Sequence, residues 1–202
     1  LTYCTERGIP VTVTASANKV SVAEQTMMLM LALAKDVVGY DHAVRTGDWS
    51  RRYALRAFEL SGRTLLLIGF GRIGKEVAAR ARAFGMRVQL VDIAMDHAKA
   101  AELGCEVVDD FRTALATADV LTLHVPRNEQ TANMVGRREF AAMKRGAVFV
   151  NCARGGLVDE TALAEALTSG QLAAAGLDVF DEEPLPAASP LRTLPNVLLS
   201  PH

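Results

Sequence analysis

From residue 63 onward, short apolar runs alternate with amphipathic helical stretches along most of the chain. The apolar runs are mostly continuous rather than alternating, which is typical of strands that are buried on both faces. Such an order indicates an α/β fold in which helices cover both faces of a parallel sheet. We predict strands at residues 63–68, 87–91, 106–108, 120–125, 147–151, 174–179 and 197–200, with helices at 72–84, 95–103, 111–118 and between Asp159 and Gly170.

Gly69, Gly71 and Gly74 form a G-x-G-x-x-G motif that directly follows the first predicted strand and opens a helix. Three glycines at this spacing can also form an ordinary tight turn between a strand and a helix, so the surrounding sequence must distinguish that turn from a dinucleotide-binding one. A dinucleotide-binding turn also needs an acid at the end of the next strand, and Asp92 supplies it. Its carboxylate would accept hydrogen bonds from the adenosine ribose and repel a 2′-phosphate. The motif therefore predicts a Rossmann-type doubly wound sheet that binds NAD rather than NADP.

Each residue of the motif has an expected role. Gly69 permits the tight turn, Gly71 lets the backbone approach a pyrophosphate, and Gly74 allows the helix to pack closely on the strand. The amides of Arg72 and Ile73 lie at the positive end of the helix, where an anion is favoured. The turn is thus predicted to hold the pyrophosphate of the cofactor.

The first sixty residues follow a different pattern. Residues 9–13 resemble a short strand, and Ser21 with Glu24 has the form of a capping box, a hydroxyl followed three residues later by a carboxylate. We predict one long connecting helix over residues 21–45. Its first part is apolar nearly all round, which indicates burial between layers or between subunits. Residues 47–61 are polar and irregular and are predicted to form a connector.

Composition excludes several kinds of partner. The chain of 202 residues has 22 basic and 23 acidic side chains, so it offers no broad basic field to nucleic acid or to an anionic membrane. Its longest apolar run, residues 27–34, is far shorter than the roughly 20 residues of a membrane-spanning helix. Cys4, Cys105 and Cys152 lack metal-ligand spacing and cannot all pair with one another. We therefore expect no metal and a reducing compartment, the cytoplasm.

Polar residues gather where the later strands end, at the edge where a doubly wound sheet binds its ligands. His124 follows the fourth strand, Arg154 the fifth, an acidic stretch at 178–183 the sixth, and His202 the seventh. Simpler interpretations exist for each. Arg154 could cap carbonyls or pair with Asp159, the loop acids could be solvated, and His124 before a proline is interpreted as structural. Spacing alone leaves a shared Arg–carboxylate–His site open.

The ordered motifs together resemble the D-isomer-specific 2-hydroxyacid dehydrogenases, whose relatives include phosphoglycerate, glyoxylate/hydroxypyruvate and formate dehydrogenases. The resemblance covers nearly the whole chain, and so many matches in order are far more specific than the glycine motif alone. The matching phrases are Asn18 with 21–24, 69–74, 124–126 with Thr131 and 134–136, 143–146, 151–160, 176–180 with 183–184, 195–197 and 201–202.

This resemblance implies a catalytic trio. Arg154 matches the arginine that holds the substrate carboxylate and carbonyl oxygen, His202 matches the catalytic histidine, and Glu183 matches the carboxylate that orients it. The chemistry agrees, because a histidine can protonate a carbonyl oxygen near neutral pH and a guanidinium suits a carboxylate and a developing oxyanion. Asp181 and Glu182 fall at variable positions and inherit no role.

The resemblance also implies cofactor contacts. Asp178 matches a residue that hydrogen-bonds the nicotinamide amide, while Val125, Cys152 and Ala153 match cofactor-lining positions. The expected NAD-binding residues are therefore Gly69, Gly71, Arg72, Ile73, Gly74, Asp92, Val125, Cys152, Ala153, Arg154, Asp178 and His202.

The chain is interpreted as a fragment of a longer protein. In the family a separate substrate domain is built from both chain ends, so residues 1–17 are expected to be the end of that domain and residues 18–202 the NAD-binding domain. The segments that distinguish one hydroxy acid from another fall mostly outside this chain.

The expected function is hydride transfer between NAD(H) and a small D-2-hydroxy acid or 2-keto acid, in a cytoplasmic homodimer. The alternative is an NAD-sensing protein like the transcriptional corepressors that resemble this family. A third hypothesis, an enzyme related to adenosylhomocysteinase, is disfavoured by the phrases at 151–160 and 178–184.

Overall fold

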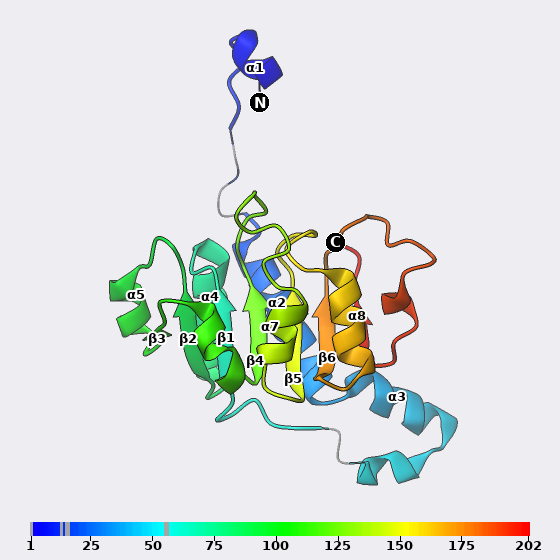
Figure 1. The fold of residues 1–202 in the computed structure, drawn as a ribbon. Coiled ribbons are helices and arrows are strands. Elements are labelled where there is room, and N and C mark those ends of the chain that lie inside the picture. Colours follow the sequence, from blue (N-terminus) through cyan, green and yellow to red (C-terminus); the bar gives the residue numbers. More distant parts are fainter. Residues whose placement is uncertain (1, 13, 15–16, 55–56) are drawn as a thin grey trace.

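The computed structural model describes residues 2–12, 14, 17–54 and 57–202. Its centre is a seven-stranded sheet in the order β3-β2-β1-β4-β5-β6-β7, in which all neighbours pair in parallel (Figure 1). The predicted doubly wound α/β fold is confirmed. The strands are β1 (Thr64–Ile68), β2 (Arg87–Val91), β3 (Glu106–Val107), β4 (Val120–Leu123), β5 (Ala147–Asn151), β6 (Leu172–Leu177) and β7 (Val197–Leu199).

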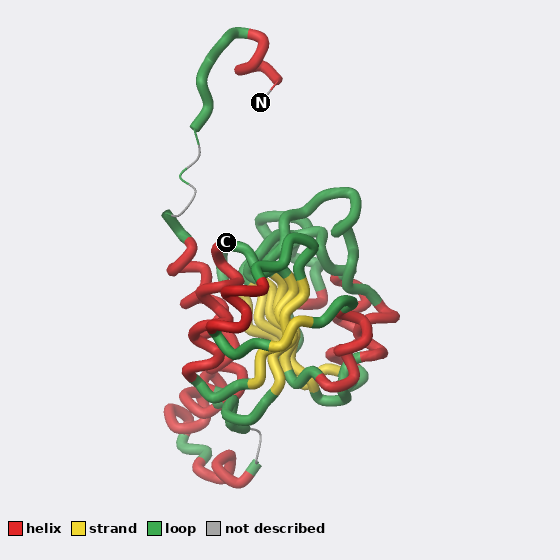
Figure 2. Tube along the Cα trace, turned by 90° about the vertical axis from the view of Figure 1, so that its left-hand side faces the viewer, coloured by secondary structure: helices red, strands yellow, loops and turns green. Residues whose placement is uncertain are grey.

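Helices cover both faces of the sheet, which Figure 2 shows edge-on between two helical layers. One layer contains α2 (Lys19–Ala34), α4 (Arg72–Ala83) and α5 (His97–Glu102), and the other contains α6 (Phe111–Ala114), α7 (Arg137–Ala142) and α8 (Glu160–Thr168). Successive side chains of a strand point to opposite faces. In β1, Leu65 and Leu67 therefore pack under the first layer, and Leu66 and Ile68 pack under the second.

Most element boundaries agree with the sequence. β2 and β5 coincide with the predicted strands, and β1, β3, β4 and β7 are shorter by one or two residues. β6 begins and ends two residues earlier than the predicted 174–179, although the Asp178 amide still donates to the Asn151 carbonyl at 3.0 Å. α8 begins as expected, because the Asp159 side chain accepts from the Ala162 amide at 2.9 Å.

The second helical layer contains a helix that was not predicted. α7 follows Gly136, whose amide donates to the Glu139 side chain at 3.1 Å. The predicted helix at 111–118 divides into α6 and a 3₁₀ turn, η2 (Leu115–Thr117).

The prediction of one helix over residues 21–45 was wrong, because α2 ends at Ala34 and α3 (Val37–Thr46) begins after a break. Asp36 has φ 47° and ψ 43°, the left-handed conformation that interrupts a helix. The Phe58 amide donates to the Ala34 carbonyl at 2.7 Å, so the connector takes the acceptor that a continuing helix would use. Arg51 holds the Asp36 carboxylate at 2.7 Å.

The predicted capping box at Ser21 was also wrong. α2 starts two residues earlier at Lys19, with Asn18 at the N-cap, so Ser21 lies within the first helical turn. The Lys19 ammonium lies 2.7 Å from Glu76 on α4, which ties the start of α2 to its neighbour in the layer.

The N-terminal segment lies apart from the sheet in Figure 1. It contains a short helix, α1 (Thr2–Glu6), and no strand in residues 9–12; Leu1, Val13 and residues 15–16 lie outside the described residues. The strand predicted over 9–13 is therefore wrong for its described part, since no other strand lies beside it to accept its hydrogen bonds. The connector contains a 3₁₀ helix, η1 (Trp49–Tyr53), and its residues 55–56 are not described.

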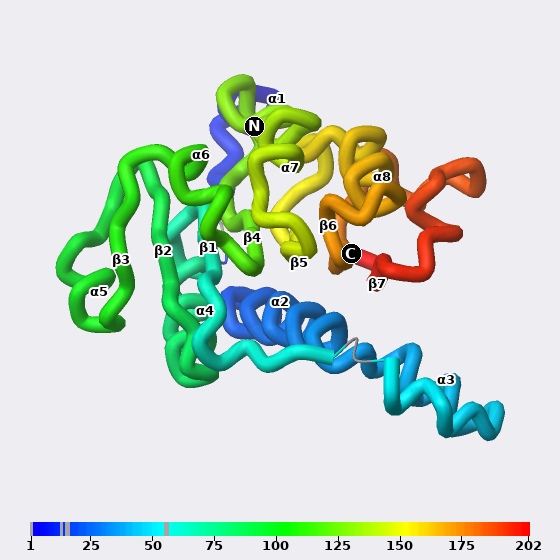
Figure 3. Tube along the Cα trace, turned by 60° about the horizontal axis from the view of Figure 1, so that its bottom comes forward, coloured from blue at the N-terminus to red at the C-terminus, as the bar shows by residue number. Residues whose placement is uncertain are grey.

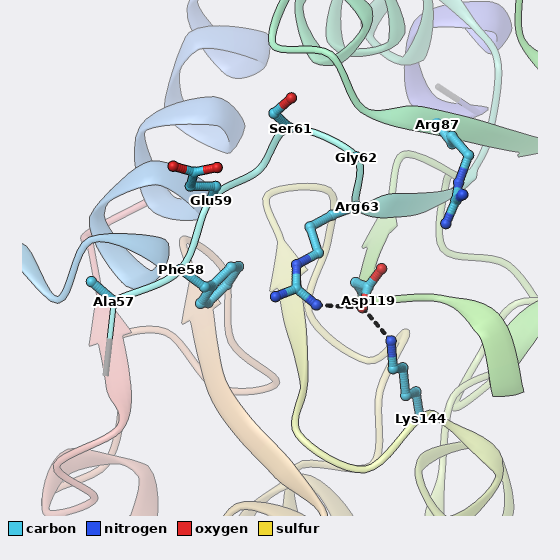
Figure 4. Close-up of a pocket in the computed structure, with 9 residues that line it drawn as sticks. All are labelled: Ala57, Phe58, Glu59, Ser61, Gly62, Arg63, Arg87, Asp119 and Lys144. Atoms are coloured by element: carbon cyan, nitrogen blue, oxygen red, sulfur yellow. Dashed lines mark hydrogen bonds and ion pairs between the residues drawn. The ribbon is translucent and has the colours of Figure 1, made fainter. Parts of the chain in front are cut away.

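The amino ends of the strands meet around Asp119, which precedes β4 (Figure 4). Its carboxylate accepts from Lys144 Nζ at 2.7 Å, from Arg63 Nη1 at 3.3 Å and from the Thr64 amide at 2.9 Å. A cavity of about 570 Å³ opens there, at the edge opposite to the predicted site residues, and contains none of them. Asp119 thus ties β1, β4 and the segment before β5 together.

None of the helices in the described ranges is long and apolar enough to cross a membrane.

Candidate active site

The register of the sheet brings the predicted site residues to one edge. Ile68 pairs with Leu123, Leu123 with Asn151, and Asn151 with Leu177, so these strands all end at the same level. The strand order reverses between β1 and β4, which is where an open α/β sheet has its ligand crevice. The predicted site residues lie in the segments that follow β1, β2, β4, β5, β6 and β7 at this edge.

The three glycines of the motif meet different surroundings. Gly69 has φ +101°, and a Cβ there would lie 2.6 Å from the backbone carbonyl of His124. A Cβ on Gly74 would collide with the Gly69 carbonyl oxygen. Gly71 has extended backbone angles, and a Cβ on it would meet nothing within 4 Å. Gly69 and Gly74 are therefore required by the fold, whereas Gly71 leaves open space beside the amino end of α4.

That open space fits a dinucleotide pyrophosphate, because the first-turn amides of α4, including those of Arg72 and Ile73, have no partner within the helix. Asp92 lies at the end of β2 and already accepts from the Phe70 amide at 2.5 Å and the Ala94 amide at 2.8 Å. A carboxylate offers about four acceptor positions, so capacity remains for ribose hydroxyls. Sequence reasoning missed that Asp92 also holds the glycine turn.

Glu183 and His202 meet although they follow different strands. His202 Nδ1 lies 2.8 Å from Glu183 Oε2, and the other oxygen of Glu183 accepts from the Phe180 amide at 3.0 Å. The hydrogen bond from His202 and then that from Phe180 lower the pKa of Glu183, with a further contribution from the charge of Arg154. A cavity of about 570 Å³ lies beside the pair, lined in part by Leu185.

Arg154 is exposed and keeps most of its guanidinium free. Its Nη1 donates to the Ala153 carbonyl at 2.5 Å, and its charge acts on Glu183. It does not pair with Asp159, which caps α8 instead. Of the two interpretations based on the sequence, carbonyl capping by one nitrogen is therefore present and the Asp159 pair is not.

The acids before Glu183 differ from it in their contacts. Asp181 accepts from the Gly156 amide at 2.5 Å, and its own amide donates to Glu160 at 2.8 Å. It therefore joins the loop after β6 to the loop after β5. Glu182 is exposed. Only the third acid reaches the histidine.

Asp178 belongs to a hydrogen-bonded group that the sequence did not reveal. Its Oδ1 accepts from Ser200 Oγ at 2.6 Å and from Gln25 Nε2 at 3.2 Å, and Gln25 Nε2 also donates to Ser200 Oγ at 2.8 Å. Neither Gln25 nor Ser200 was recognised from the sequence, because Gln25 lies in a largely apolar helix and Ser200 lies two residues before the predicted catalytic histidine. The one available signal was a polar side chain in a helix otherwise expected to be buried.

The remaining predicted residues are poorly accessible. Cys152 and Ala153 are 5% and 8% exposed, and burial raises the pKa of the Cys152 thiol to about 12, so it is a neutral thiol. Val125 is half-buried. Burial lowers the pKa of His124 to about 3, and its Nε2 lies 3.2 Å from Thr122 Oγ1, which supports the structural interpretation of His124.

Comparison with known proteins agrees with this arrangement. The family described as D-isomer specific 2-hydroxyacid dehydrogenase, NAD binding domain, matches residues 27–202. D-3-phosphoglycerate dehydrogenase of Methanocaldococcus jannaschii is 47% identical over 198 residues, which are 98% of this chain and 37% of that protein. Hydroxypyruvate reductase of Thermotoga maritima is 46% identical over 200 residues, which are 98% of this chain and 63% of that protein.

The crystal structure of NAD-dependent formate dehydrogenase from Staphylococcus aureus in complex with NAD is similar at a TM-score of 0.86 and 32% identity, covering 100% of this chain and 61% of that one. The family is defined by NAD binding, which the open glycine turn and Asp92 also fit. The cofactor is therefore NAD, and the chain belongs to the NAD-binding domain family of the D-isomer specific 2-hydroxyacid dehydrogenases.

Proposed function

We propose that the protein containing this chain transfers a hydride between NAD(H) and a small D-2-hydroxy acid or its 2-keto partner, with Arg154, Glu183 and His202 as the catalytic residues. The observation that carries the proposal is the 2.8 Å contact between His202 Nδ1 and Glu183 Oε2. A carboxylate on Nδ1 sets the tautomer that carries a proton there and favours the charged imidazolium. Nε2 is then the atom that exchanges a proton with substrate.

The proposed mechanism uses each member of the trio differently. In keto-acid reduction, His202 Nε2 donates its proton to the carbonyl oxygen while Glu183 stabilises the imidazolium. The free nitrogens of Arg154 bind the substrate carboxylate and the developing oxyanion. The bound cofactor supplies the hydride to the carbonyl carbon. In the oxidative direction, neutral His202 accepts the hydroxyl proton.

The test is a panel of 2-keto acids, including glyoxylate, hydroxypyruvate and pyruvate, assayed with NADH on the full-length protein. Oxidation of NADH that depends on one of these acids supports the enzyme. Tight NADH binding without turnover of any member of the panel would contradict it and would instead support the NAD-sensing alternative.

We also propose that the protein is a homodimer. α3 and η1 project beyond the sheet (Figures 1 and 3) and expose large apolar side chains. These are Val37, Val38, Val44, Trp49 and Tyr53, which are 51–72% exposed. A groove of about 560 Å³ beside them is lined by residues of α2, α3 and β7. Val38→Asp should shift sedimentation of the full-length protein from dimer to monomer, and a monomeric parent would contradict the proposal.

Two further assignments belong with this function. We assign residues 1–17 to a substrate domain, because the described apolar residues Tyr3, Ile9 and Val11 are 47–63% exposed. The described part of this segment, which includes α1, lies away from the sheet (Figure 1). A full-length structure in which these apolar residues pack on this sheet would contradict that assignment. We place the protein in the cytoplasm, since its three cysteines are free thiols. Fractionation that finds it elsewhere would overturn this.

A further inference from the structure

α2 contributes the polar side chain of Gln25 to the hydrogen-bonded group around Asp178. Most of its other inward-facing residues are apolar and buried, as Ala23, Met27 and Met30 are. Gln25 is half-buried and reaches Asp178 and Ser200, which lie 153 and 175 residues later in the chain. A polar side chain that is partly withdrawn from water needs its hydrogen bonds. Here both bonds go to the loops that follow β6 and β7.

The three side chains are joined by short hydrogen bonds. Gln25 Nε2 lies 3.2 Å from Asp178 Oδ1 and 2.8 Å from Ser200 Oγ, so its amide donates toward both of these neighbouring oxygens. The single hydroxyl proton of Ser200 goes to the same Asp178 oxygen at 2.6 Å. The result is a closed ring of hydrogen bonds in which a carboxylate receives two donors on one oxygen.

The other carboxylate oxygen is left for a ligand. Asp178 Oδ2 accepts no hydrogen bond from the described residues, and Asp178 itself is half-buried at the end of β6. The terminal torsion of an aspartate side chain is broad, so an unsupported carboxylate samples many orientations. Two donors on Oδ1 fix the carboxylate plane and point Oδ2 in one direction. An amide N–H₂ group is the kind of donor that such an oxygen accepts.

We propose that Gln25 and Ser200 are positioning residues, which orient Asp178 so that its Oδ2 receives the carboxamide of the nicotinamide ring. This rests on the proposed function and on the contact with that carboxamide that the family resemblance implies for Asp178. Ser200 has a second effect, since its amide donates to the Leu177 carbonyl at 2.9 Å and it lies two residues before His202. One residue therefore fixes both the nicotinamide acceptor and the segment that carries the proton donor.

The experiment compares two ligands on the full-length protein. NADH carries the nicotinamide, and ADP-ribose lacks it while keeping the adenosine and pyrophosphate. Gln25→Met removes the amide donor at similar side-chain length, and Ser200→Ala removes the hydroxyl. Each should raise the Kd for NADH about three- to tenfold, the range for losing an ordinary hydrogen bond, and leave the Kd for ADP-ribose unchanged. Ser200→Thr keeps a hydroxyl and should restore NADH affinity.

The neighbouring Glu24→Gln is the matched control, because Glu24 is exposed and makes only a 4.0 Å ion pair with Arg80. It should change neither affinity. Equal weakening of NADH and ADP-ribose by Gln25→Met and Ser200→Ala would overturn the proposal in favour of a general structural role. Unchanged NADH affinity in both variants would also overturn it.

Asp178→Ala separates this inference from the nicotinamide contact on which it rests. If Asp178→Ala weakens NADH selectively and the Gln25 and Ser200 variants do not, only the positioning role fails. If Asp178→Ala itself leaves NADH affinity unchanged, the nicotinamide contact assigned to Asp178 is wrong and the positioning role fails with it, while the panel of 2-keto acids still tests the proposed function by itself.

Discussion

His202 Nδ1 and Glu183 Oε2 lie 2.8 Å apart at the ends of two separate loops, the one after β7 and the one after β6. The Phe180 amide binds the other Glu183 oxygen at 3.0 Å, so the carboxylate is held from both sides. Because Nδ1 of His202 is hydrogen-bonded to Glu183, only Nε2 remains to exchange a proton with a substrate. The geometry of the pair is set by the protein before any substrate binds.

His202→Ala should therefore lower kcat for keto-acid reduction by roughly 10²–10⁴, the range for losing a general acid or base. Glu183→Gln keeps the shape of the side chain but removes the charge that favours imidazolium. The falling limb of the pH–rate profile should then move to lower pH. Steady-state kinetics of the full-length protein across pH measure both effects.

Glu182→Gln is the control for this pair, because Glu182 is an adjacent and exposed acid. Its pH–rate profile should match that of the parent. A shift caused by Glu182→Gln and not by Glu183→Gln would show that the acid is misassigned by one residue. A His202→Ala variant with nearly parental activity would place the proton donor elsewhere.

Alanine substitutions at Gly71 and Gly74 should affect different properties, the first NADH affinity and the second the stability of the fold. Gly71→Ala adds a methyl group in open space, so unfolding free energy should change by no more than about 0.5 kcal/mol. That methyl group occupies the approach to the pyrophosphate, and NADH affinity should fall at least about tenfold. Gly74→Ala collides with the Gly69 carbonyl and should cost about 1–3 kcal/mol of stability.

Calorimetric titration and thermal unfolding of both glycine variants give the answer. The opposite pattern, with Gly71→Ala destabilised and Gly74→Ala folding normally, is incompatible with the assigned roles.

Asp92 should make the protein prefer NAD to NADP by at least about tenfold, equivalent to ~1.4 kcal/mol, since a carboxylate beside a 2′-phosphate places like charges together. Asp92→Asn should reduce this preference. The variant keeps one acceptor for the Phe70 or Ala94 amides, which the carboxylate binds in the parent, so the turn retains part of its support. Equal affinities of the parent for NAD and NADP would remove Asp92 from the ribose site.

Asp119 should make stability depend on pH. Burial acts to raise its pKa, but the hydrogen bonds from Lys144, the Thr64 amide and Arg63 together lower it. A lowered carboxylate pKa stabilises the fold above the unfolded value of about 3.9, and this contribution is lost as pH falls through the folded pKa. Asp119→Asn should cost about 1–2 kcal/mol at pH 7, given that Arg63 and Lys144 are half-exposed.

Denaturant unfolding at pH 7 and at about pH 3 measures this difference. The gap between parent and Asp119→Asn should narrow in acid. A gap that stays constant would mean that the carboxylate charge contributes nothing to stability.

Features carried by neighbouring residues could be predicted from the sequence. The continuous apolar runs correctly predicted the parallel sheet, and the spacing of Gly69, Gly71 and Gly74 correctly predicted the turn at the end of β1. Asp159 sits directly before the helix that it caps, so that helix start was also correct. In each case the interaction that decides the structure lies within a few residues of the pattern.

Features that depend on distant residues could not be predicted in this way. At the break before α3, the Phe58 amide donates to the Ala34 carbonyl and Arg51 forms an ion pair with Asp36. No local sequence pattern predicts either contact. The ring around Asp178 joins residues as far as 175 positions apart. No proline interrupts residues 21–45, so one helix was predicted, and tertiary hydrogen bonds support a break at Asp36 instead.

The close contact between α2 and β6 has a consequence for synthesis of the chain. A Cβ on Gly176 would lie 3.0 Å from Leu29 Cβ, so the helix rests almost directly on the strand backbone. α2 leaves the ribosome long before its partner strand exists. At roughly 5–20 residues per second, Gly176 is made on the order of ten seconds after Leu29, so the part of α2 that packs on β6 stays uncovered for that time. We therefore expect the nascent chain to be most prone to aggregation, and most in need of chaperones, before Gly176 covers this part of α2.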